Sequence, residues 1–555
     1  MTPEYKAEKL ASVSDLQGGG IWEINLLTLA APISVFVWSV LQTRQAFFKP
    51  YNLTAYATDF VLQCCMILFA TTIYADQPQT LLGLLLVPAI AVYLQPKAAD
   101  ASDAKVASYD TKVAVSNGTT DAAASQDEEL IDHRSPLPVK PFITSYRGAM
   151  MIITCASILA VDFPVFPRRF AKTENFGTSL MDLGVGSFVF AAGIVAARQH
   201  LKDQLMGSHA SFFNGIKTSL RHALPLFALG LVRLASVKSL DYTEHISEYG
   251  VHWNFFFTLA LLSPTTALLQ PLLRHIPSVG TLAFCIAICY EIYLYVTPGM
   301  KAYILLSDRI PGDFLSQNRE GIYSFIGYFA IFLGGFGVGE GILPRDQEPS
   351  TETTLQQAKR QIQEQKDTMD EDAEWLASVL GQSPDQIAAK KPWAPDEALR
   401  GLGTLPKLAV IHLAKWSALW FIFSTWAMWH YGPRLFVSRR MANLAYVCWV
   451  CAFNTAQLLL FCGVEMLMSP QLYRSRDKAV EKTRIEEATS KVLAAFNRNG
   501  LVLFLLANLL TGAVNLSVKT WHVGDMEAMV WLVGYVGVVC GTGIMLDQYG
   551  VSIKL

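Results

Sequence analysis

The chain has 555 residues, of which 52% are hydrophobic and 16% are charged, and its mean hydropathy is +0.31. These values are too apolar for a water-soluble protein of this size, so they favour a polytopic membrane protein surrounded by a lipid bilayer. The net charge of -2 excludes the broad basic surface of a nucleic-acid-binding protein, and we expect no nucleic acid partner.

A membrane-spanning helix needs about 20 predominantly apolar residues. This criterion predicts an all-α polytopic membrane protein, with about thirteen transmembrane helices in one bundle and a single domain over residues 1–555. The third and sixth ranges have the weakest apolar signal. The predicted spans cover residues 22–42, 53–74, 78–95, 142–162, 178–198, 219–238, 252–273, 277–297, 321–343, 407–430, 440–467, 499–518 and 524–546.

Three polar connections interrupt the apolar pattern. Residues 96–140 are rich in small and acidic side chains, which predicts a disordered loop. Residues 344–403 are charged with apolar positions at helical spacing, which predicts a loop with an amphipathic helix. Residues 468–498 are basic. All three follow odd-numbered spans, so the positive-inside rule makes them cytoplasmic, with a lumenal amino terminus and a cytoplasmic carboxyl terminus.

The connection between the fourth and fifth spans breaks that charge rule. The stretch AVDFPVFPRRFAKTENFGTSLMDLGVGSF, residues 160–188, places Arg168, Arg169 and Lys172 on the predicted lumenal side. Asp162 lies at the carboxyl end of the fourth span, where the helix dipole disfavours a carboxylate by about 0.3–1 kcal/mol. We therefore expect Asp162 to have a cationic partner, with Lys172 the leading candidate and the two arginines the others.

Two interpretations of this cluster are open. In the first, salt bridges simply close a loop on the membrane surface. In the second, Asp162 removes a proton from an attacking alcohol while Lys172 stabilises the developing oxyanion or orients the carboxylate. The planar guanidinium groups of Arg168 and Arg169 would then bind a phosphate on the substrate.

Three motifs carry a family resemblance. The stretch at 160–188, EYGVHWNFFFTLALL at 248–262 and LSQNREGIYSFIGYFAIFL at 315–333 closely resemble the glycosylphosphatidylinositol (GPI) inositol-acyltransferase family, called PIG-W in animals and Gwt in fungi. The resemblance extends over nearly all the spans. The aspartate and lysine of the family motif, ten positions apart, fall on Asp162 and Lys172.

The resemblance implies a multi-pass enzyme of the endoplasmic reticulum membrane. Such an enzyme moves a fatty acyl group, usually palmitoyl, from acyl-CoA to the inositol ring of glucosaminyl-phosphatidylinositol during GPI-anchor assembly. Its partners are these two substrates. Acyl-CoA is a co-substrate, and no bound cofactor is expected.

The other two motifs suggest substrate-binding residues on the same side of the membrane. His252 and Asn254 open the seventh span, and Asn318, Arg319 and Glu320 precede the ninth. They could bind the sugar or the lipid headgroup. Alternatively, they could be interface anchors and ion pairs between helices.

Polar residues inside the spans are costly if they face lipid, so we expect them to face the bundle interior. This set comprises Asp182, Arg233, Glu291, His412, Lys415, Asn454, Glu465 and Asn508. The glycine-rich run at 334–341 lacks the strand-and-helix context of a phosphate-binding loop and predicts close helix packing.

The sequence also bears on two other kinds of function, metal binding and lipid transport. Cys448 and Cys451 form a CxxC pair, but it lies in an apolar span, and we expect no metal site. A lipid transporter or scramblase fits the composition as well as an enzyme does. Many transporters carry inverted repeats, and no such repeat is visible in this sequence.

Overall fold

The structure is a computed structural model that describes residues 3–95, 135–205, 212–239, 248–273, 275–276, 278–345, 408–431, 437–470, 472–473 and 478–551. The predicted loop at 96–140 and the predicted amphipathic segment at 344–403 lie almost wholly outside these residues. Those two expectations stay predictions.

Within the described residues the chain is helical, and its only extended pairing is a single bridge between Gly18 and Thr178. The long helices are α2 (Ile21–Thr28) continued by α3 (Ala30–Gln45), α4 (Leu53–Phe60) continued through a π-helical turn into α5 (Met66–Thr71), α6 (Pro78–Tyr93), α8 (Pro141–Ala160), α9 (Leu180–Leu205), α10 (Phe212–Ser239), α11 (Phe255–Leu273), α12 (Val279–Val296), α15 (Arg319–Ile342), α19 (Leu408–Tyr431), α20 (Leu444–Met468), α23 (Gly500–Ser517) and α24 (Asp525–Gln548). Shorter helices are α1 (Pro3–Ala11), α13 (Met300–Leu305), α14 (Phe314–Gln317), α21 (Lys478–Glu487) and α22 (Lys491–Arg498).

Each predicted span falls on one of these helices, which confirms the all-α polytopic membrane class. In the described part of the chain, 10 helical segments are long and apolar enough to cross a membrane, and α6 and α11 are shorter apolar helices. The remaining helix, α10, carries four lysine or arginine side chains and one histidine, which lower its hydropathy. The count of thirteen spans therefore stays a prediction.

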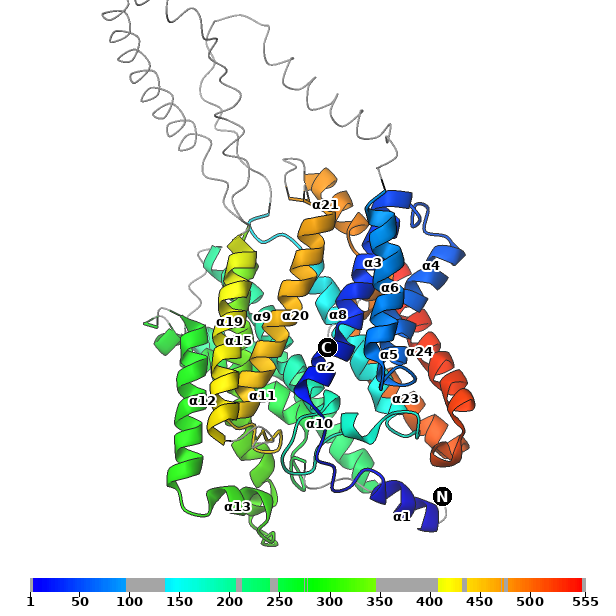
Figure 1. The fold of residues 1–555 in the computed structure, drawn as a ribbon. Coiled ribbons are helices and arrows are strands. Elements are labelled where there is room, and N and C mark those ends of the chain that lie inside the picture. The colour runs from blue at the N-terminus through cyan, green and yellow to red at the C-terminus, as the bar shows by residue number, and fades with distance from the viewer. Residues whose placement is uncertain are drawn as a thin grey trace, which may run out of the picture.

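The bundle has two distinct ends (Figure 1). In that view α1 and α13 lie at the lower end, and α21 lies at the upper end. Because α1 contacts the connection that follows α8, that connection also belongs to the lower end. The helix ends that border the two long polar connections lie together at the upper end, and the side of the membrane that this end faces stays a prediction.

The glycine-rich run serves helix packing, as predicted. A Cβ atom added at Gly335 of α15 would lie 2.1 Å from the carbonyl oxygen of Phe190 on α9. The same separation, 2.1 Å, would arise between a Cβ at Gly193 of α9 and the carbonyl oxygen of Phe332 on α15. Only a residue without a side chain allows the two backbones to approach this closely.

The expectation for polar residues inside the spans is partly wrong. Four of them are buried in the bundle and His412 is half-buried, but three are exposed on its surface. The buried ones are Asp182, Glu291, Asn454 and Glu465, and the exposed ones are Arg233, Lys415 and Asn508. Asn508 donates to the carbonyl of Phe504 in its own helix, and long basic side chains can extend toward the membrane surface.

Candidate functional site

Asp162 lies just after the end of α8, and a partner from the beginning of the chain holds its carboxylate. The Nζ atom of Lys9 on α1 lies 2.8 Å from Asp162 Oδ1, and Asn515 Nδ2 donates to Oδ2 at 2.7 Å. Lys9 also donates to Asn515 Oδ1 at 2.8 Å, so the three side chains form a closed triangle. Asp162 remains 17% exposed, which leaves its carboxylate reachable.

Helix α1 is fixed in this position by contacts with the connection between α23 and α24. The hydroxyl of Tyr5 accepts from the backbone N–H of Trp521 at 3.1 Å and lies 3.4 Å from Thr520 Oγ1. Glu8 lies 3.0 Å from His522 Nε2. These contacts hold Lys9 against Asp162.

Lys172 pairs with Glu248 and not with Asp162, so the expected ion pair between Asp162 and Lys172 is wrong. The Lys172 ammonium lies 2.8 Å from Glu248 Oε1 and 3.1 Å from Oε2. Arg439 lies 3.6 Å from the same carboxylate. Burial acts to raise the pKa of Glu248, but the charges of Lys172 and Arg439 outweigh it and lower the pKa to about 2.

A buried charge network continues inward from this pair. Arg439 Nε lies 2.6 Å from Asp182 Oδ1. The other oxygen of Asp182 accepts from the hydroxyls of Thr173 at 2.7 Å and Ser179 at 2.8 Å, and from the Thr173 backbone N–H. This network fixes the backbone beside Lys172, while the Lys172 side chain itself is 40% exposed.

Arg168 and Arg169 use their guanidinium groups on the protein itself. Arg168 donates to the carbonyl oxygens of Val161, Phe163 and Phe166, which fixes the turns that follow α8. Arg169 pairs with Glu23 at 2.7 Å and with Asp76 at 2.5 Å. These contacts favour the loop-closing interpretation for both arginines, and phosphate binding by them stays a prediction.

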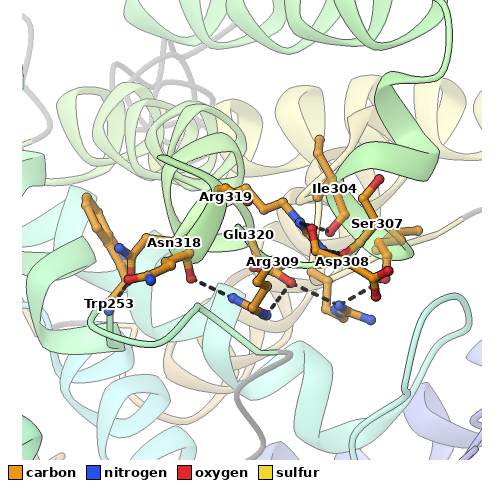
Figure 2. Close-up of polar contacts among 12 residues, drawn as sticks. Trp253, Ile304, Ser307, Asp308, Arg309, Asn318, Arg319 and Glu320 are labelled. Carbon is orange, nitrogen blue, oxygen red and sulfur yellow. Dashed lines mark hydrogen bonds and ion pairs between the residues drawn. The ribbon is translucent and has the colours of Figure 1, made fainter. Parts of the chain in front are cut away.

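The HWN motif is tied to the residue before α15 (Figure 2). The side-chain oxygen of Asn318 accepts from the backbone N–H groups of His252 at 2.8 Å and Trp253 at 3.0 Å. Asn254 caps α11 by accepting from the N–H of Phe256 at 3.0 Å. His252 Nε2 lies 3.1 Å from the side-chain oxygen of Gln317.

Arg319 and Glu320 also make contacts within the protein (Figure 2). The Arg319 guanidinium donates to three carbonyl oxygens, those of Ile304, Ser307 and Asp308. Glu320 lies 2.7 Å from Arg309 and 3.3 Å from Arg440. The two motifs therefore fasten the loops at the lower end of the bundle, and headgroup binding by their five predicted residues remains untested.

Sequence reasoning missed the partners that complete the site. Arg439 and Arg440 are adjacent cations directly before a span, a signal that could have drawn attention to them. Lys9 and Asn515 carried no comparable signal, whereas Glu248 is the first residue of the motif at 248–262. The arrangement offers one reachable carboxylate and one reachable ammonium group at the same end of the bundle, which suits proton transfer and oxyanion stabilisation.

Comparison with known proteins adds an independent observation. The family model described as GWT1 matches residues 5–546. The chain is 46% identical to GPI-anchored wall transfer protein 1 of Aspergillus oryzae, over all of both chains. It is 44% identical to the protein of that name from Aspergillus fumigatus, over 100% of this chain and 99% of the relative. For the Saccharomyces cerevisiae protein, the identity is 34% over 99% of each chain.

Proposed function

The chain belongs to the GWT1 family, and we propose that it is an acyl-CoA-dependent inositol O-acyltransferase of GPI-anchor biosynthesis. It moves a fatty acyl group, palmitoyl in the usual case, to an inositol hydroxyl of glucosaminyl-phosphatidylinositol. The enzyme resides in the endoplasmic reticulum membrane with a lumenal amino terminus. The name of its relatives, GPI-anchored wall transfer protein 1, supports the pathway.

In the proposed reaction, Asp162 takes the proton from the inositol hydroxyl. The alkoxide oxygen forms a bond to the thioester carbon, the carbon–sulfur bond breaks, and the CoA thiolate leaves and takes up a proton. Lys172 donates a hydrogen bond to the carbonyl oxygen as negative charge develops on it. Lys9 and Asn515 are positioning residues that orient the Asp162 carboxylate.

The observation that carries this proposal is the state of the Asp162 carboxylate. It is 17% exposed and held in one orientation by two side chains, at the end of the bundle that also presents Lys172. A base has to be oriented and reachable at once, and a buried structural salt bridge would not leave it reachable.

Transfer of a labelled acyl group from palmitoyl-CoA by purified protein in detergent tests the proposal. We expect Asp162→Asn and Lys172→Ala each to lower turnover by about 10²–10⁴-fold, the usual contribution of such groups. Asp76→Asn removes an exposed carboxylate, 82% accessible, that pairs with Arg169, and should keep normal turnover as the matched control.

Undiminished turnover in both variants would remove the pair from the mechanism. If the wild-type protein formed no covalent product, the enzyme assignment would fail. A lipid transporter or scramblase would behave in that way, because it moves lipid without forming or breaking a covalent bond.

A further inference from the structure

Arg147 is a cation without a counter-charge inside a spanning helix. It lies about two turns after the start of α8. Among the described residues it makes no hydrogen bond or ion pair, whereas Arg168, Arg319 and Arg439 each make several. A half-buried guanidinium this close to the start of α8 can extend toward the membrane surface, where a phosphate group of a bound ligand would give it a counter-charge.

Helix α8 presents one partly exposed stripe that includes Arg147. Thr144, Met150, Thr154 and Ile158 are half-buried, as is Arg147, and they recur every three or four residues. Most other side chains of α8 are buried against neighbouring helices, chiefly α20, α22 and α23. The stripe therefore lies on the side of α8 that is least covered by other helices. It runs along the helix and ends close to Asp162.

A second polar group without a partner lies along the same part of α8. The side-chain oxygen of Asn497 on α22 is buried and has no hydrogen-bond partner among the described residues. The flanking residues of Asn497 pack against α8 on either side of it. A Cβ added at Gly148 would lie 2.5 Å from the Leu493 carbonyl oxygen, and one at Gly500 would lie 2.7 Å from Met151 Cε.

We propose that Arg147 binds a phosphate group of the acyl-CoA donor, with Asn497 facing the same half of α8. A guanidinium binds phosphate through two parallel hydrogen bonds. The unpartnered Asn497 oxygen is an acceptor, so it suits an amide N–H of the pantetheine arm and not the phosphate. The inference rests on the proposed function, because it names the part of the donor that this second site holds.

Both substrates carry phosphate, and the distance between Arg147 and Asp162 shows which of them could place a phosphate at Arg147. Arg147 and Asp162 are 15 residues apart, about 22 Å along α8 at 1.5 Å per residue. The acceptor phosphate is bonded directly to the inositol ring and cannot reach Arg147 while a ring hydroxyl lies at Asp162. The pantetheine arm of CoA is as long as about four extended residues, on the order of 15 Å, which is the same scale as the separation.

The location also explains how a cytoplasmic donor meets a lumenal carboxylate. Arg147 lies in the half of α8 next to the described start of that helix, which borders the predicted cytoplasmic loop at 96–140. Asp162 lies at the opposite end. Acyl-CoA would bind with its phosphates toward the cytoplasm and its thioester directed along the stripe toward Asp162.

The test compares two donors in the purified full-length protein: palmitoyl-CoA and S-palmitoyl-pantetheine, which carries no phosphate. We expect Arg147→Ala to raise the KM for palmitoyl-CoA by about 10- to 100-fold, the range of a hydrogen bond to a charged group. The KM for palmitoyl-pantetheine and for glucosaminyl-phosphatidylinositol should stay unchanged. Arg147→Lys should give an intermediate KM, and Arg221→Ala, which removes an exposed cation, is the matched control.

Thermal unfolding supplies a readout that does not depend on turnover. Removing an unpaired cation from a spanning helix should leave the Tm of Arg147→Met equal to or above the wild-type value, whereas loss of a structural arginine would lower it. Added CoA should raise the Tm of the wild type and not that of Arg147→Met.

Equal KM changes for both donors, or a change confined to the acceptor, would overturn the inference while leaving the proposed function intact. CoA-dependent stabilisation that needs Arg147, in a protein that transfers no acyl group, would support the site and refute the function. A lowered Tm for Arg147→Met with unchanged CoA response would identify Arg147 as structural and overturn the inference.

Discussion

The carboxylate of Glu248 lies beside two cations, Lys172 and Arg439, and their effect on its pKa allows a change in stability to be predicted. Its pKa is lowered from the ordinary 4.5 to about 2, with burial opposing the shift and Lys172 and Arg439 producing it. A folded-state pKa below the unfolded value stabilises the fold at every pH above 4.5, by about 3 kcal/mol for this shift. That stabilisation is lost as the pH falls from 4.5 to about 2.

The change Glu248→Gln should therefore lower stability at pH 7 by about 3 kcal/mol, measured as the midpoint of unfolding in detergent. It should also lower acyl transfer, because Lys172 loses its ion-pair partner. The difference in stability from the wild type should shrink as the pH falls toward 3. The change Glu23→Gln removes a carboxylate that, in the described part of the chain, lies near no buried arginine comparable to Arg439, so it should cost at most about 1 kcal/mol. Equal stability of Glu248→Gln and the wild type at pH 7 would refute this reasoning.

Two more predictions concern Lys9 and the helix-packing glycines. Lys9→Met should lower kcat/KM for acyl transfer by about 10- to 100-fold, because Asp162 loses a charge-assisted hydrogen bond; an unchanged kcat/KM would show that Lys9 does not position the base. Gly335→Ala should destabilise the bundle by about 1–3 kcal/mol, because the added methyl group meets a carbonyl oxygen of α9. In Gly534→Ala nothing lies within 4 Å of the new Cβ, so an equal loss of stability there would contradict the packing argument.

The spanning helices could be predicted because each carries its own signal. Length and apolar content mark a helix such as α15 or α20 with no knowledge of its neighbours. The signal is weakest in α10, whose basic residues reduce its hydropathy although the predicted span at 219–238 falls on this helix. The rule that polar residues in spans face the bundle interior fails for Asn508. Its side-chain amide donates to a carbonyl oxygen of its own helix, so the residue need not face the interior.

The partners in the candidate site could not be predicted, because they come from remote parts of the chain. Local spacing suggested Lys172 for Asp162, ten residues away, and the fold instead brings Lys9 and Asn515 to it. Lys172 finds Glu248, 76 residues further along the chain. A charge cluster identifies where charges gather, but only the packing of helices decides which of them meet.

The triangle of Lys9, Asn515 and Asp162 has a consequence for the order in which the protein matures. Lys9 and Asn515 are 506 residues apart, so a ribosome adding about 5–20 residues per second needs roughly 25–100 s to join them. During that time Asp162 is already synthesised but lacks its hydrogen bond from Asn515. Helix α1 likewise lacks its hydrogen bond with the backbone of Trp521. A nascent or truncated chain would thus be inserted before it could orient its carboxylate. Assembly of the last two spans would act as the step that makes the enzyme competent.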